Sequence, residues 1–174
     1  MQPLVNKGYD MARVGWDQYF MNIATVVATR ATCNRKHVGA LIVKDKRILA
    51  TGYNGSIRGT EHCGDDNHIM EDGHCVRVLH AESNALSQAA MYGVSIKDAM
   101  LYVTALPCWP CYKLISNAGI QEIVYGEPYR AADHISRIFD HAVITQTLIR
   151  PRDVHVAEGM PITRAFLEQI NVLP

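Results

Sequence analysis

His80-Ala81-Glu82 and, further along the chain, Pro107-Cys108-Trp109-Pro110-Cys111 decide both the fold and the chemistry. Zinc prefers Cys and His ligands in a tetrahedral arrangement, and a catalytic zinc site keeps three protein ligands and one water. Cys108 and Cys111 are three residues apart at the start of a predicted helix, so both sulfurs can face one point. His80 begins another predicted helix. The two motifs therefore predict a catalytic zinc ion bound by His80, Cys108 and Cys111.

Glu82 lies two residues after His80, and we expect it to carry protons rather than to bind the metal. Zinc lowers the pKa of a bound water to about 7. A nearby carboxylate can take that proton and deliver it to a substrate nitrogen and to a leaving amine. The motifs H-x-E and P-C-x-x-C occur together in zinc-dependent nucleobase deaminases, where the His and Cys residues bind zinc and the Glu transfers protons. A structural zinc site or a redox dithiol would explain the cysteine pair but has no use for the glutamate.

Length and charge narrow the class of protein. A chain of 174 residues predicts a single domain, 1–174. Its 17 basic and 17 acidic residues argue against a polynucleotide partner, because phosphate neutralisation dominates that affinity. No apolar stretch reaches the ~20 residues that a membrane-spanning helix needs, and Met1–Arg13 has no apolar signal-peptide region. We therefore expect a cytoplasmic protein without a membrane partner, whose five cysteines serve metal binding or catalysis.

The hydrophobic pattern predicts alternating helices and strands. Apolar residues recur at spacings of three and four over 16–30, which predicts a helix. The apolar runs 38–44 and 47–53 flank Asp45-Lys46 and predict a hairpin. The remaining predicted elements are helices at 80–92, 109–118, 135–141 and 163–170, and strands at 100–105, 121–125 and 143–148. This order predicts an α/β fold, a three-layer α-β-α sandwich with a mixed central sheet of about five strands and helices on both faces.

These motifs resemble the cytidine and deoxycytidylate deaminase superfamily, and more narrowly its deoxycytidylate (dCMP) deaminases of bacteria and phages. The similarity covers about 16–130. It includes Thr32-Cys33, Val38-Gly39-Ala40, Gly52-Tyr53-Asn54-Gly55, His74-Cys75, residues 80–85, Tyr102-Val103-Thr104 and residues 107–111. The resemblance implies a cytidine deaminase-like fold and hydrolysis of dCMP to dUMP and ammonia, which supplies dUMP for thymidylate synthesis. It also implies a homo-oligomer, with a hexamer favoured, that is activated by dCTP and inhibited by dTTP, with Mg²⁺ accompanying these triphosphates.

The resemblance also assigns individual residues. His80, Cys108 and Cys111 match the zinc ligands and Glu82 the proton shuttle. Asn54 matches a position that binds the deoxyribose and base, although Asn-Gly is also a strong turn signal. Ala40 matches the position whose backbone meets the pyrimidine edge. Tyr129 and Arg130, after a predicted strand, match the segment that reaches the 5′-phosphate, and a solvated loop is the alternative. Arg35, Lys36 and Arg58 are rival phosphate-binding candidates, and we assign them, together with Gly55, to an effector triphosphate site.

A second zinc ion is expected to hold together residues 55–79, which are polar and rich in Gly, Asp and His. Some members of the superfamily carry an extra structural zinc in this insertion, and a metal can hold together a segment that lacks core residues. The expected ligands are Cys33, Cys63, His68 and Cys75, with His74 as a replacement for one of them. Free cysteines and solvated histidines are the alternative.

Three other functions compete with this interpretation. A nucleoside cytidine deaminase would act without a 5′-phosphate, and a tRNA-type deaminase would act on a polynucleotide. A zinc-stabilised binding module would have no activity. Residues 145–174 lie outside the resemblance, and we expect them to form a C-terminal extension.

Overall fold

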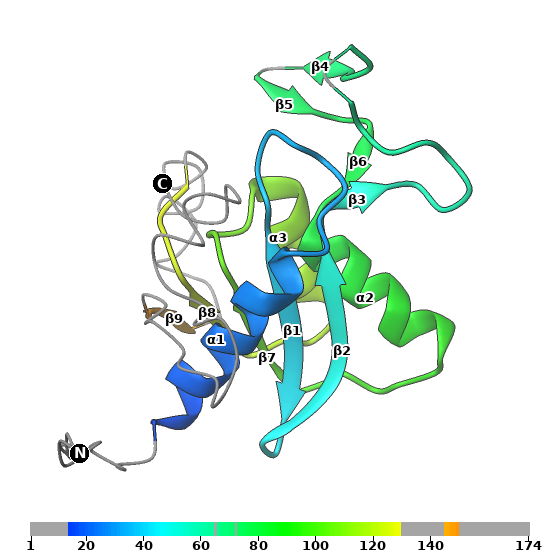
Figure 1. Ribbon diagram of the computed structural model, residues 1–174. Coiled ribbons are helices and arrows are strands. Elements are labelled where there is room, and N and C mark those ends of the chain that lie inside the picture. The colour runs from blue at the N-terminus through cyan, green and yellow to red at the C-terminus, as the bar shows by residue number, and fades with distance from the viewer. Residues whose placement is uncertain (1–13, 65, 72, 130–144, 150–174) are drawn as a thin grey trace, which may run out of the picture.

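The computed structural model describes residues 14–64, 66–71, 73–129 and 145–149. Within them a five-stranded sheet has the order β2-β1-β7-β8-β9 (Figure 1). β1 is antiparallel to β2 and β7, whereas β7, β8 and β9 run parallel. The strands are β1 Gly39–Lys44, β2 Arg47–Tyr53, β7 Met100–Val103, β8 Glu122–Tyr125 and β9 Thr145–Leu148. The expected hairpin and the mixed sheet of about five strands are confirmed.

Helices cover both faces of this sheet. α1 (Trp16–Ala28) packs on one face, where Leu41, Val43 and Tyr102 form a buried cluster with its apolar residues. α2 (Ala81–Met91) and α3 (Trp109–Asn117) cover the other face, where the alternate residues Ile42 and Leu101 are buried. Strand residues therefore alternate between the two cores, as the pleat requires. The predicted three-layer sandwich is confirmed.

The insertion segment, residues 55–79, stands beyond the end of the sheet (Figure 1). It is mostly loop, as expected, but it contains two short antiparallel pairs that the sequence pattern did not predict. β3 (Gly55–Ser56) pairs with β6 (Val78–Leu79), and β4 (Met70–Glu71) pairs with β5 (His74–Cys75). The predicted helices at 135–141 and 163–170 lie outside the described residues. None of the described helices is long and apolar enough to cross a membrane.

Gly52 lets the first turn of α2 lie directly on β2. A Cβ atom at this position would overlap the carbonyl oxygen of Ala81 and crowd the backbone of Ala85. Gly39 makes the same close approach to α1, where a Cβ would overlap the carbonyl oxygen of Ala24. These two glycines set the distance between the sheet and its helices. Gly52 thereby places the His80-Ala81-Glu82 motif against the end of β2.

We expect Gly52→Ala to lower the free energy of unfolding by about 1–3 kcal/mol, because backbone atoms must move apart to admit the methyl group. Chemical denaturation followed by circular dichroism measures this change. Gly64→Ala is the matched control, since a Cβ there meets nothing within 4 Å. Equal stability of the two variants would contradict the close approach at Gly52.

Candidate metal centres and active site

The structure brings His80, Cys108 and Cys111 together. The Nδ1 atom of His80 lies 3.3 Å from the sulfur of Cys108 and 3.5 Å from that of Cys111. The three candidate ligand atoms all lie within 4.8 Å of one another. One nitrogen and two sulfurs at this spacing fit three corners of a zinc tetrahedron and leave the fourth open. The donor set therefore fits a zinc ion with one open position.

Two helix N-termini position these ligands. His80 is the N-cap residue of α2 and Cys108 is the N-cap residue of α3, and neither side chain caps its helix. The exposed N–H groups of a helix N-terminus carry partial positive charge, which favours thiolates. Contact with the Cys111 sulfur and the hydrogen bond from His80 both lower the pKa of Cys108 to about 4. The hydrogen bond to Cys108 raises the pKa of His80 in turn.

Glu82 is buried in the first turn of α2, with 4% of its surface exposed. It is not a member of the group of ligand atoms, although it lines the same cavity. Burial raises the pKa of its carboxyl group to about 7. A carboxyl group with a pKa near neutrality can both accept and return a proton, which suits general acid–base catalysis.

A second group contains Cys33, Cys63, His68 and Cys75, the four residues that the sequence predicted. Their ligand atoms also lie within 4.8 Å of one another. The Nδ1 atom of His68 is 3.3 Å from the Cys75 sulfur, which is itself 4.0 Å from the Cys63 sulfur. Burial disfavours the Cys75 thiolate, but the hydrogen bond from His68 and backbone hydrogen bonds outweigh it and lower the pKa to about 7. Three sulfurs and one nitrogen fit a closed, structural zinc site.

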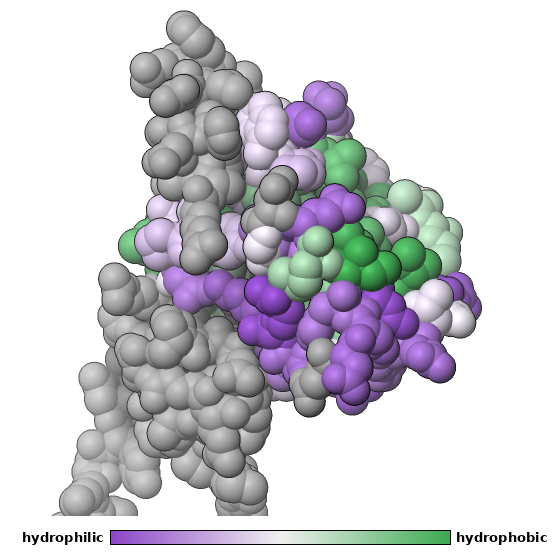
Figure 2. Space-filling model, turned by 90° about the horizontal axis from the view of Figure 1, so that it is seen from above, coloured by the Kyte–Doolittle hydropathy of each residue, from purple (hydrophilic) through white to green (hydrophobic). Residues whose placement is uncertain are grey.

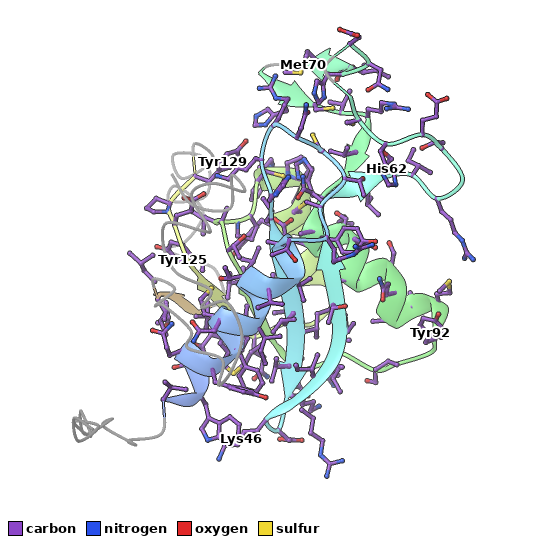
Figure 3. The ribbon with its side chains drawn as sticks, viewed as in Figure 1. Lys46, His62, Met70, Tyr92, Tyr125 and Tyr129 are labelled. Carbon is purple, nitrogen blue, oxygen red and sulfur yellow. The ribbon has the colours of Figure 1, made fainter. Side chains whose placement is uncertain are left out.

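Both groups border one cavity of about 330 Å³. His80, Glu82 and Cys108 line it on one side, and Cys33 and Cys75 of the second group line it as well. In Figure 3 the labelled His62, Met70 and Tyr129 lie toward this end of the molecule, whereas Lys46 lies at the opposite end. Seen from above, the described surface here is largely hydrophilic, with a smaller hydrophobic area (Figure 2). The cavity has the size of a small-molecule site.

Basic and aromatic residues also line this cavity. Lys36 forms an ion pair with Glu127 and lies over the ring of Tyr129, 5.1 Å from its centre. Tyr129 and His74 share a hydrogen bond of 2.8 Å. Arg35 donates a hydrogen bond of 3.2 Å to the carbonyl oxygen of Gly73. Arg35, Lys36 and Tyr129 therefore meet at the candidate active site.

Other predicted residues lie elsewhere. Gly55 pairs with Leu79, and Arg58 is exposed; neither belongs to the lining of this cavity. Ala40 is fully buried in β1 and does not line the cavity either, whereas Val38, the residue just before the strand, does. Arg130 lies outside the described residues. The roles predicted for these residues stay predictions.

Asn54 lines the cavity and also fixes the backbone beside it. Its Oδ1 atom accepts a hydrogen bond of 2.7 Å from the N–H of Val38, and its Nδ2 atom donates one of 2.7 Å to the carbonyl oxygen of Lys36. The side chain is 7% exposed. Asn54 therefore ties the loop with Cys33, Arg35 and Lys36 to the end of β2.

Sequence reasoning missed three residues at the site. Val38 and His74 line the cavity, and His74 had been considered only as a metal ligand. The hydroxyl of Ser83 lies 3.4 Å from the sulfur of Cys111. Ser83 follows Glu82 directly, but a serine within a helix is common, so only the folded arrangement identifies this contact.

The sequence model of the cytidine and deoxycytidylate deaminase zinc-binding region matches residues 14–127. The chain belongs to the cytidine and deoxycytidylate deaminase family. It is 46% identical over 135 residues to ComE operon protein 2 of Bacillus subtilis, covering 78% of this chain and 71% of that protein. It is 40% identical over 127 residues to the deoxycytidylate deaminase of Mycobacterium phage D29, covering 66% of this chain and 97% of the phage protein.

A solved structure of the family gives the same fold. The dCMP deaminase of cyanophage S-TIM5, in complex with dCMP and dUMP, superposes with a TM-score of 0.67 at 33% sequence identity. The match covers 78% of this chain and 99% of the phage chain. The family membership and the zinc-binding region agree with the Cys/His group at the starts of α2 and α3. The chain is thus a deaminase of the zinc-binding type.

Asn54→Ala should destabilise the protein by about 2–3 kcal/mol, because two backbone groups near the cavity lose their hydrogen-bond partners. Thermal and chemical unfolding measure the loss. Asn117→Ala, at the exposed C-terminal end of α3, is the control and should stay close to wild type. A stability of Asn54→Ala equal to that of the control would show that these backbone bonds do not depend on the amide.

Proposed function

We propose that this deaminase hydrolyses dCMP to dUMP and ammonia. The observation that carries the proposal is the single cavity that joins His80, Glu82 and Cys108 to Arg35 and Lys36. The lining thus combines metal-ligand candidates and a carboxyl group with cationic side chains. A pyrimidine nucleoside monophosphate offers an amino-bearing ring to the first kind of group and a phosphate to the second. The relatives and the neighbouring structure named deoxycytidylate or dCMP deaminase support the same substrate.

His80, Cys108 and Cys111 would hold the catalytic zinc, which supplies a Lewis acid that makes water acidic near neutral pH. Glu82 takes a proton from the attacking water and gives it to the ring nitrogen next to the reacting carbon. The C–O bond forms at C4 in this first step. Glu82 then takes the remaining proton from the new hydroxyl group and gives it to the amino nitrogen, and the C4–N4 bond breaks to release ammonia and leave a C4 carbonyl group. A pKa of about 7 lets one carboxyl group perform both transfers.

Recognition of the 5′-phosphate is assigned to the basic part of the wall. Arg35 and Lys36 supply charge, and Tyr129 supplies a hydroxyl. We therefore propose that Arg35 and Lys36 bind the substrate phosphate, rather than an effector as expected from the sequence. Arg130 is a further candidate for phosphate binding, because it directly follows Tyr129 in the sequence. Asn54 would contact the deoxyribose with its remaining amide hydrogen, and the backbone near Ala40 would meet the pyrimidine edge.

The remaining features follow the resemblance. We propose a second, structural zinc at Cys33, Cys63, His68 and Cys75, supported by the spacing of their ligand atoms. A site for dCTP and dTTP, with Mg²⁺, is assigned to the loop of Gly55 and Arg58 on the basis of the sequence. The proposal also includes one domain over 1–174 with a C-terminal extension at 145–174, a hexameric assembly, a cytoplasmic location and a role in supplying dUMP for thymidylate synthesis.

Ammonia release from dCMP, deoxycytidine and CMP tests the substrate. Loss of the phosphate removes charge-assisted hydrogen bonds worth about 1.5–3 kcal/mol, so we expect kcat/KM for deoxycytidine to be roughly 10- to 100-fold lower than for dCMP. Turnover of dCMP should rise with dCTP and fall with dTTP.

Equal turnover of deoxycytidine and dCMP would make the chain a nucleoside deaminase and would remove the proposed role of Arg35 and Lys36. Absence of turnover on all three compounds would favour a polynucleotide substrate or an inactive binding module.

Glu82→Gln should lower turnover at least 100-fold, because amides do not accept and return protons in this range. The variant should still contain two zinc ions per chain, measured by atomic emission, because Glu82 is outside both ligand groups. Glu71→Gln, an exposed change in β4, is the matched control with wild-type turnover. Retained turnover in Glu82→Gln would contradict the mechanism, and one zinc per chain in the wild type would contradict the second centre.

A further inference from the structure

The second Cys/His group is part of the wall of the candidate substrate cavity. Cys33 and Cys75 line the cavity that also contains Glu82, and so do their neighbours Gly73 and His74. Cys63 and His68 belong to the group but lie outside the lining. A metal bound there would therefore hold two residues that face the nucleotide and two that do not.

The insertion segment has few buried side chains to keep it in place. Among its described residues from 57 to 79, only Cys63 and Cys75 are buried. The buried cluster beneath it consists of Cys33, Cys63 and Cys75, with Val78 packed against them. Its β-ladders are only two residues long on each strand. Segments with so few apolar contacts open at low cost in free energy, so a metal at this cluster would supply most of the ordering.

Two hydrogen bonds from this segment end on residues to which we assign phosphate binding. Arg35 donates to the carbonyl oxygen of Gly73, and Tyr129 is hydrogen-bonded to His74. Gly73 and His74 directly precede Cys75, the metal-ligand candidate that lines the cavity. Displacement of Cys75 would thus remove two partners that orient Arg35 and Tyr129.

We propose that metal binding at the second centre and nucleotide binding in the cavity are thermodynamically coupled, because the metal holds one wall of the nucleotide site in its binding form. This inference rests on the proposed function. Coupling of this kind is reciprocal, so the factor by which the metal tightens the nucleotide equals the factor by which the nucleotide tightens the metal. The second centre then sets substrate affinity in addition to holding the segment together.

Cys63→Ser tests one direction. It removes a ligand of the second centre that does not line the cavity, so a change in nucleotide affinity does not come from a lost contact with the nucleotide. We expect the variant to retain one zinc per chain and to bind dUMP about tenfold more weakly than the wild type in titration calorimetry, within the usual range of coupling factors. His62→Ala, at the exposed neighbouring residue, should keep two zinc ions and wild-type affinity.

Wild-type affinity of Cys63→Ser for dUMP, with one zinc bound, would overturn the coupling. The reciprocal measurement uses the wild-type chain and stays informative if that variant does not fold. The protein is loaded with cadmium-113, whose resonances separate the site with three thiolates from the site with two. A chelator is then added stepwise with and without saturating dUMP.

We expect dUMP to raise by about tenfold the chelator concentration that empties the three-thiolate site. Protection of the two-thiolate site alone would overturn the coupling and leave the proposed function standing, because nucleotide would then bind without affecting the second centre. Protection of neither site would overturn both. Deoxyuridine should protect the three-thiolate site less than dUMP, because it lacks the phosphate that Arg35 and Tyr129 contact.

Discussion

The contact between Gly52 and the first turn of α2 is the constraint on which the site depends. The sheet and the helix approach so closely there that a single methyl group has no room. This approach brings the start of α2 to the end of β2. Asn54, two residues after Gly52, fixes the neighbouring loop. His80 and Glu82 at the start of α2, and the loop that carries Arg35 and Lys36, take their positions from this junction between one strand and one helix.

The sequence predicted the layers of the fold because the helices and the longer strands of the sandwich have recognisable patterns. The hairpin has apolar runs on either side of Asp45-Lys46, and both of these residues adopt positive φ angles, as a two-residue type I′ turn requires. The strands β7 and β8 alternate between the two cores, and their helices start at recognisable motifs. The short ladders of the insertion segment were not predictable, because two-residue pairs have no period to detect.

The two ligand groups were predictable for a different reason. Cysteines and histidines are few, and the chemistry of zinc restricts how they combine. Charged residues have no such restriction, which is why Arg35 and Lys36 could be assigned equally well to a substrate or to an effector. Only the folded chain shows that the loop held by Asn54 carries both of them to the wall of the cavity. The contact between Ser83 and Cys111 likewise depends on two helices whose relative placement no local pattern encodes.

The use of N-cap positions for metal ligands limits how this protein can be stabilised by design. Ser, Thr, Asp or Asn at an N-cap adds about 1 kcal/mol of stability to many helices, and engineers introduce such residues routinely. At α2 and α3 those positions are held by His80 and Cys108, neither of which caps its helix. Improving either cap would delete a candidate zinc ligand. Stabilising N-cap substitutions are therefore not available at α2 and α3. Both helices begin without a capping side chain because these positions carry candidate metal ligands.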